Sequence, residues 1–178
     1  DRAMADIYAL LKWRPSFCLP DIDAADRIRI GIVGVPGRMR TIHSLLELLA
    51  LFAGAITEIV IISDEEEPFF PGQQEELETA GLTLRLASDL QQELPALDVI
   101  YINTIAWVGD DYEELGSRYR LVSSSPFKPD AIILHPLARG NELPRELDET
   151  PHNWYFAQAR GAVFMRMALL SSIMKTFT

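Results

Sequence analysis

The sequence predicts an α/β fold, a three-layer, Rossmann-like domain with a parallel sheet of about five strands. Apolar runs alternate along the chain with segments in which apolar residues have helical spacing. This alternation favours right-handed crossovers between parallel strands. The apolar runs are nearly continuous, as expected for strands that helices cover on both faces. Strands are predicted at residues 27–33, 58–63, 82–87, 98–103 and 131–134.

Helices are predicted where apolar residues recur three and four positions apart. The first one ends at Arg14 and Pro15, because proline cannot continue a helix. Gly54 and Gly81 mark the ends of two later helices. The predicted ranges are 2–13, 39–52, 73–80, 90–94, 112–121, 151–159 and 163–177. No repeat or linker divides residues 1–178, which we therefore expect to form a single domain.

The composition fits one domain with a sizeable core, since 48% of the 178 residues are hydrophobic and 24% are charged. The net charge of -10 argues against nucleic acid or an anionic membrane as a partner, because both require a basic face. The single cysteine, Cys18, excludes an internal disulfide, and no spacing typical of a metal site occurs. Glu47 and Glu58 interrupt the most apolar stretch, so no membrane helix is expected. We expect no cofactor and, without a signal peptide, a cytoplasmic location.

The end of the last predicted strand is the clearest indication of a binding site. The apolar run 131–134 stops at His135 and Pro136, and Pro136 lacks the N–H that a sheet ladder needs. The chain therefore leaves the sheet sharply at its carboxyl edge. Open α/β sheets bind their ligands at this edge, so we expect the residues of this exit to contact a ligand.

The turn between the first predicted strand and the next helix contains Gly31, Gly34 and Gly37. Turns of this kind direct N–H groups and a helix dipole at an anion. The spacing departs from the dinucleotide pattern G-x-G-x-x-G, because Val33 replaces a glycine and Pro36 removes an N–H. A tight turn of small residues is therefore favoured, and an NAD-binding module remains a weaker alternative.

Two arginines, Arg38 and Arg40, flank the start of the helix that follows this turn. Guanidinium groups bind carboxylates and phosphates through paired hydrogen bonds. Either these arginines hold an anionic ligand, or they pair with Glu47 and with the acidic run 64–67. The sequence leaves both interpretations open.

Four segments of the chain carry distinctive motifs. Residues 34–45 end in R-T-I-H-S-L, residues 98–103 read D-V-I-Y-I-N, and residues 135–143 read H-P-L-A-R-G-N-E-L. Residues 148–170 contain D-E-T-P-H-N-W-Y-F-A-Q-A and then V-F-M-R-M-A-L-L. Together they resemble the second, amino-acid-binding domain of the aspartate/ornithine carbamoyltransferases. The first and third motifs resemble that family's G-x-x-x-x-G-R-T-x-H-S-L and H-P-L-P-R-x-x-E-[IL], and the resemblance covers nearly the whole chain.

The resemblance implies roles for individual residues. Arg40 falls where the family holds the substrate carboxylate. Backbone groups that meet carbamoyl phosphate and the amino group fall at three consecutive positions, Pro136, Leu137 and Ala138. Supporting residues are expected at His43, His135 and Arg139, of which Arg139 takes the place of a structural arginine. No catalytic residue and no metal ligand is assigned.

The chain also departs from the family. The family's lysine before the R-T-x-H arginine is Gly37, and Thr104 and Ala106 replace the arginine and glutamine of its T-R-x-Q motif. Ala138 replaces a proline, and Arg2 stands in the place of the glutamine that ends an H-P-T-Q turn. The family's S-x-R-T-R phosphate loop does not occur in these 178 residues. We therefore expect no carbamoyltransferase activity from this chain by itself.

Two functions from different classes follow. The first is an amino-acid-binding domain of a divergent aspartate carbamoyltransferase-like protein of pyrimidine biosynthesis, active only with a phosphate-binding domain supplied elsewhere. The second is a catalytically silent, pseudoenzyme-like domain that serves assembly or regulation. The expected ligand is a small carboxylate or amino acid. Because the predicted helices 2–13 and 163–177 are strongly apolar, we also expect them to recruit a second copy or a partner chain.

Overall fold

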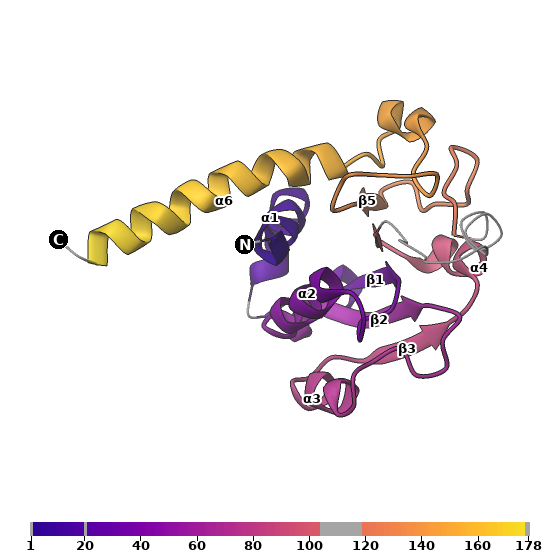
Figure 1. Cartoon of the computed structure of the whole chain (residues 1–178), viewed down its shortest axis with the longest axis horizontal. Helices are drawn as coiled ribbons and strands as arrows, with labels where there is room; N and C mark the ends of the chain where they lie inside the picture. Colours follow the sequence, from indigo (N-terminus) through magenta and orange to yellow (C-terminus); the bar gives the residue numbers. More distant parts are fainter. Residues whose placement is uncertain (1, 20, 104–118, 177–178) are drawn as a thin grey trace.

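Five strands form one parallel sheet in the order β3-β2-β1-β4-β5, in a computed structural model that describes residues 2–19, 21–103 and 119–176 (Figure 1). The strands are β1 (Ile28–Val33), β2 (Ile56–Ile62), β3 (Leu84–Ala87), β4 (Val99–Ile102) and β5 (Ile132–Leu134). Each predicted strand is present, with ends that differ by one or two residues. The predicted fold class and the Rossmann-like strand order are confirmed.

Helices cover both faces of this sheet, so the expected three layers are present. The helices are α1 (Arg2–Trp13), α2 (Arg40–Ala50), α3 (Gln73–Thr79), α4 (Leu90–Glu93) and α6 (Tyr155–Thr176). Alternate strand residues face opposite layers. On one face, Ile30, Ile59 and Tyr101 pack with α1 and α2, and on the other, Val60, Ile100 and Ile133 pack with α4 and the 119–147 segment.

The closing helices differ from the prediction. Instead of two helices at 151–159 and 163–177, one continuous helix, α6, runs through Gly161. A Cβ at Gly161 would lie 2.2 Å from Cδ1 of Tyr8, so the glycine makes room for close packing against α1 and does not end the helix. The helix predicted at 112–121 falls mainly outside the described residues, and Tyr119–Leu121 is not helical.

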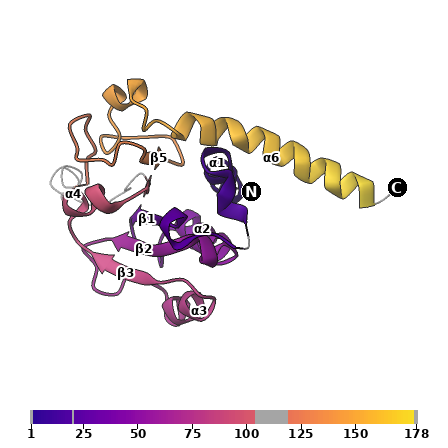
Figure 2. The ribbon, with the colours of Figure 1, turned by 180° about the vertical axis from the view of Figure 1, so that it is seen from behind.

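The first turns of α6 pack on α1, and the later turns extend beyond the body of the domain (Figures 1 and 2). Tyr8 of α1 and Phe164 of α6 are in ring contact, with centroids 6.4 Å apart. From Val163 onward α6 exposes a series of large apolar side chains: Val163, Phe164, Met167, Leu170, Ile173 and Met174. None of the helices in the described ranges is long and apolar enough to cross a bilayer.

Candidate functional site

The candidate site lies at the carboxyl edge of the sheet, where the first turn of α1 meets the exits of β1 and β5. Because the strands are parallel, the turn after β1 and the chain after β5 emerge on the same side. Arg2 joins α1 to this edge, since its Nη2 donates a hydrogen bond to the backbone carbonyl of His135 at 3.2 Å. Three segments that are distant in sequence therefore come together here.

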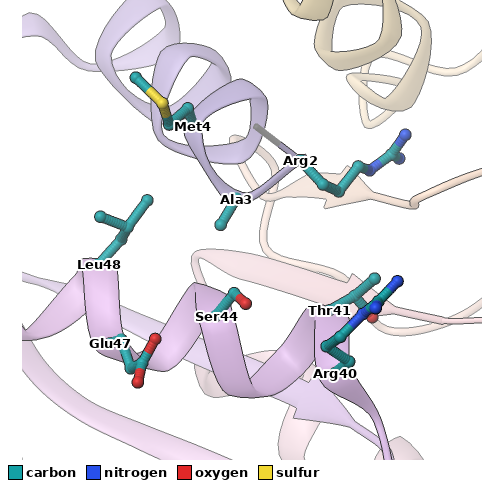
Figure 3. A pocket seen from close by; sticks show the side chains of 8 residues that line it. All are labelled: Arg2, Ala3, Met4, Arg40, Thr41, Ser44, Glu47 and Leu48. Atoms are coloured by element: carbon teal, nitrogen blue, oxygen red, sulfur yellow. The ribbon is translucent and has the colours of Figure 1, made fainter.

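A pocket of about 380 Å³ opens between the starts of α1 and α2 (Figure 3). We call it the arginine pocket; its lining residues are Arg2, Ala3, Met4, Arg40, Thr41, Ser44, Glu47 and Leu48. The guanidinium groups of Arg2 and Arg40 lie at the same end of this pocket, and Glu47 lies toward the other end (Figure 3). Two cations at one end of the pocket suit an anionic ligand.

The two arginines around the start of α2 differ in whether they form an ion pair. Arg38 donates to Oε1 of Glu65 at 2.5 Å, which is the pairing with the acidic run that the sequence left open. Arg40 is exposed and makes no ion pair with any residue in the described ranges. Its other candidate partner, Glu47, contacts His43 instead, at 3.2 Å. Of the two arginines, Arg40 is therefore the one available to an anion.

His135 is fully buried just after β5, and its ring is held by two partners. The Leu137 amide donates to Nδ1 at 2.8 Å, so this nitrogen carries no proton. Nε2 therefore carries the proton and donates to Oε1 of Glu142 at 2.9 Å. Glu142 also accepts the Gly140 N–H at 2.7 Å. These contacts close residues 135–142 into one loop, which we call the His135 loop.

The pKa of Glu142 reflects this arrangement. Burial raises the pKa of the carboxyl, but the hydrogen bonds from His135 and from backbone N–H groups outweigh burial and leave it below its usual value. Glu142 is therefore ionised at neutral pH and accepts the hydrogen bond from Nε2 of His135. His135 thus holds the loop in shape, and its ring is not exposed to a ligand.

The backbone that the resemblance assigns to substrate contact has an uncommon conformation. Leu137 has a φ of 43°, a left-handed value that branched residues rarely adopt, and the Leu137–Ala138 peptide is cis. The positive φ of Leu137 is held by the hydrogen bond that its N–H donates to Nδ1 of His135. Pro136 is buried, whereas Ala138 is exposed. Three backbone units are thereby presented in a single conformation.

Arg139, expected to be a supporting residue, pairs with an acidic side chain close to the start of α6. Its guanidinium forms paired hydrogen bonds with the carboxylate of Asp148 and lies 5.8 Å from the ring centroids of Tyr155 and Phe156. The ion pair lowers the pKa of Asp148, because Arg139 donates to its carboxylate. Arg139 therefore fastens the end of the His135 loop to the start of α6.

His43 points away from the arginine pocket. Oε1 of Gln73 accepts the Phe70 N–H, so Nε2 of Gln73 donates to Nδ1 of His43 at 2.7 Å. The ring then donates from Nε2 to Glu47. The structure therefore places His43 between α2 and α3, apart from Arg40 and the His135 loop.

The glycine turn after β1 is closed by its own backbone. Gly34 N–H donates to Ile62 O at 3.1 Å, and Gly37 N–H donates to Pro68 O at 2.7 Å. A Cβ at Gly37 would lie 2.9 Å from the backbone of Phe69, so no side chain fits there. These N–H groups are not free for a phosphate, which weighs against the dinucleotide alternative. Thr104 and Ala106 lie outside the described residues.

Two site-bordering residues were missed by sequence reasoning, Asp6 of α1 and Gln158 of α6. Both are fully buried, and Nε2 of Gln158 donates to Oδ1 of Asp6 at 2.5 Å. Burial raises the pKa of Asp6 to about 6, although Gln158 and Arg2 act to lower it. The signal in the sequence was a lone acid within the apolar stripe of the first helix. The described residues include no group of three or more metal-binding side chains.

A parallel sheet with a pocket and a fixed loop at its carboxyl edge is typical of α/β domains that bind ligands at that edge. Residues 26–173 match the family model for the Asp/Orn binding domain of aspartate/ornithine carbamoyltransferase. The chain belongs to this family, and the resemblance inferred from its motifs is confirmed.

The relatives are catalytic subunits of aspartate carbamoyltransferase. The subunit from Methanopyrus kandleri is 36% identical over 154 residues, which cover 83% of this chain and 49% of that protein. The subunit from Aliivibrio salmonicida is 32% identical over 155 residues, covering 84% of this chain and 49% of that protein. The chain thus spans about half the length of these relatives.

Solved structures show the same likeness. The catalytic subunit of M. jannaschii aspartate transcarbamoylase has a TM-score of 0.81 at 25% identity, covering 98% of this chain and 56% of that one. Aspartate transcarbamoylase from Trypanosoma cruzi, in complex with aspartate and phosphate, has a TM-score of 0.79 at 25% identity. That alignment covers 95% of this chain and 53% of the other.

Proposed function

We propose that this chain forms the amino-acid half of a carbamoyltransferase site. Arg40, with Arg2 beside it, holds the carboxylate of an amino acid, and the backbone of residues 136–138 faces the reacting groups. A phosphate-binding domain on another segment or chain completes the site. The observation that carries the proposal is the pairing pattern of the arginines: Arg38 has a carboxylate partner, and Arg40 has none within the described residues.

Local electrostatics supports a carboxylate ligand at this place. The chain carries a net charge of -10, so most of its surface repels anions. The first turn of α2 contains no acidic residue, and its unsatisfied N–H groups add positive potential beside Arg40. Arg2 contributes a second guanidinium to the same pocket. An anion therefore meets a local attraction that the rest of the surface does not offer.

Carbamoyl transfer also needs groups that this pocket does not supply. An amine attacks the carbonyl carbon of carbamoyl phosphate, the bond to the phosphate oxygen breaks, and phosphate leaves with its electron pair. Negative charge grows on the carbonyl oxygen, and preorganised donors must stabilise it. The amine loses a proton, which the departing phosphate can take up, and carbonyl oxygens in the His135 loop are suited to orient the amine by accepting hydrogen bonds from it. The amino acid that this chain positions can react only when carbamoyl phosphate is held next to it.

The 178-residue chain alone is expected to form no N-carbamoyl amino acid from carbamoyl phosphate and L-aspartate. A colorimetric assay for the carbamoyl group, with a blank that lacks protein, measures this. Co-expression with the part of the Methanopyrus kandleri subunit that this chain does not cover is expected to produce activity. Product from the chain alone contradicts the proposal. A stable complex without activity instead favours the catalytically silent alternative.

Arg40→Ala is expected to weaken L-aspartate binding in that complex by roughly tenfold to a hundredfold, as loss of a charge-assisted hydrogen bond costs about 1.5–3 kcal/mol. Isothermal titration of the complex measures the dissociation constant. The matched control is Arg38→Ala, two residues away, because Arg38 is held by Glu65. Equal affinities in wild type and Arg40→Ala would remove Arg40 from the site. Tight binding of NAD in the same titration would favour the dinucleotide alternative.

The exposed apolar side chains of α6 are expected to make the chain associate. Light scattering across a dilution series should show a mass above that of one chain, because large apolar patches on solvated helices favour burial. Leu170→Glu should shift the population to monomers, whereas Ser171→Glu, a change at the neighbouring exposed position, should not. A wild-type monomer at every concentration, without binding of a hydrophobic dye, would show that α1 covers α6 sufficiently.

A further inference from the structure

The geometry points to Asp6 as a positioning residue for this site: through Gln158 it fixes the His135 backbone and thereby the loop that meets the ligand. The inference deepens the proposed function and rests on it for the identity of the ligand. It concerns a residue on α1 that touches neither the arginine pocket nor the loop backbone directly.

Asp6 and Gln158 form a chain of hydrogen bonds that ends on the backbone of His135. The His135 N–H can only donate, so the group that it contacts at 2.8 Å is Oε1 of Gln158. The amide of Gln158 is thus oriented with Nε2 toward Asp6, which accepts from it. All three residues are fully buried. Water therefore offers none of these groups a replacement partner, and losing one bond leaves a buried donor unsatisfied.

Helix α1 also holds the backbone carbonyl of His135. Arg2 lies one turn before Asp6 and donates to the His135 carbonyl. α1 therefore fixes the carbonyl directly and the N–H through α6. Because the His135 ring in turn accepts the Leu137 N–H, the left-handed backbone at Leu137 depends on this arrangement.

The groups around Asp6 make a carboxylate the suitable acceptor. Arg2 on its own helix and Gln158 on α6 both favour the charged form of Asp6, whereas burial opposes it. From β4, Tyr101 faces Asp6, and burial together with the Asp6 charge raises the pKa of its phenol. Thr41 of α2 lies next to Tyr101 and lines the arginine pocket. Groups from three elements, α1, α6 and β4, therefore act on Asp6, at the back of the proposed site.

Hydrogen exchange resolved by NMR tests the inference without any ligand. In Asp6→Leu the amides of His135 and Leu137 should exchange at least about tenfold faster, while the Ile32 amide in β1 should keep its rate. Asp6→Asn should restore slow exchange, since its carbonyl oxygen can still accept from Gln158. If Asp6→Leu does not fold, Gln158→Met, which keeps length and removes both bonds, makes the same test. Unchanged exchange at His135 and Leu137 would overturn the inference, as would equal acceleration at Ile32.

Ligand binding in the co-expressed complex completes the test. Asp6→Leu or Gln158→Met should weaken L-aspartate binding by about tenfold, and Asp6→Asn should stay within about threefold of wild type. Unchanged affinity in the leucine variant would overturn the positioning role. If wild type binds no aspartate while the two loop amides still respond to Asp6, the proposed function fails and the positioning of the loop stands.

Discussion

Glu142→Ala is expected to lower the free energy of unfolding by about 3 kcal/mol, because it leaves one buried donor and one half-buried donor unsatisfied. These donors are Nε2–H of His135 and the N–H of Gly140, both within 3 Å of the same carboxylate oxygen. The loss is larger than for a neutral acceptor, since hydrogen bonds to a charged group are stronger. Urea unfolding followed by fluorescence gives the midpoint and slope that measure the change.

The matched control is Glu146→Ala in the same region of the chain. Glu146 is exposed and accepts one N–H, from Ser123, so its removal should cost less than about 1 kcal/mol. Equal changes in the two variants would mean that the Glu142–His135 contact does not hold the His135 loop. Because the folded pKa of Glu142 is lowered, its contribution should be full above its usual pKa of 4.5 and lost as the pH falls through the lower folded value.

The strands of the sheet could be predicted because each is encoded by a short, continuous stretch of sequence. Each strand is a short apolar run between turns, and alternating helices leave few topologies open. Helix ends were less predictable. Gly161 lies in the gap left between the two predicted closing helices, yet in the structure it is within α6 and packs against Tyr8 near the other end of the chain. Only the tertiary packing distinguishes a glycine that ends a helix from one that allows close packing within it.

The candidate site likewise has residues that local sequence predicts and contacts that it does not. Arg40, His135 and the residues after it could be singled out, because motif spacing and the carboxyl edge of the sheet both pointed to them. That Arg38 pairs with Glu65, or that His43 turns toward Gln73, depends on side-chain contacts between distant segments. The chain from Asp6 through Gln158 to His135 joins residues from both ends of the sequence, and no local pattern reveals it.

Asp6→Asn is expected to make the protein more stable at pH 7.5, by as much as about 3 kcal/mol. Burial raises the folded pKa of Asp6 from 3.8 to about 6, and each pKa unit corresponds to about 1.4 kcal/mol. Between these two values the folded chain holds a proton that the unfolded chain has released, so wild-type stability falls as the pH rises. The stability difference between the variants should grow from near zero below pH 3.8 to its full value above pH 6.

Urea midpoints of both proteins across this pH range measure that difference. Both proteins contain the same other titrating groups, whose contributions cancel when the two unfolding free energies are subtracted. The remaining pH dependence is therefore specific to Asp6. A constant difference at all pH values would show that Asp6 has an ordinary pKa in the folded protein. A pH-dependent gain in stability would instead show that the wild-type chain keeps a costly buried charge. Folding alone does not explain such a charge, because asparagine offers Gln158 the same acceptor. What the charge of Asp6 adds is its attraction for Arg2, which donates a hydrogen bond to the His135 carbonyl.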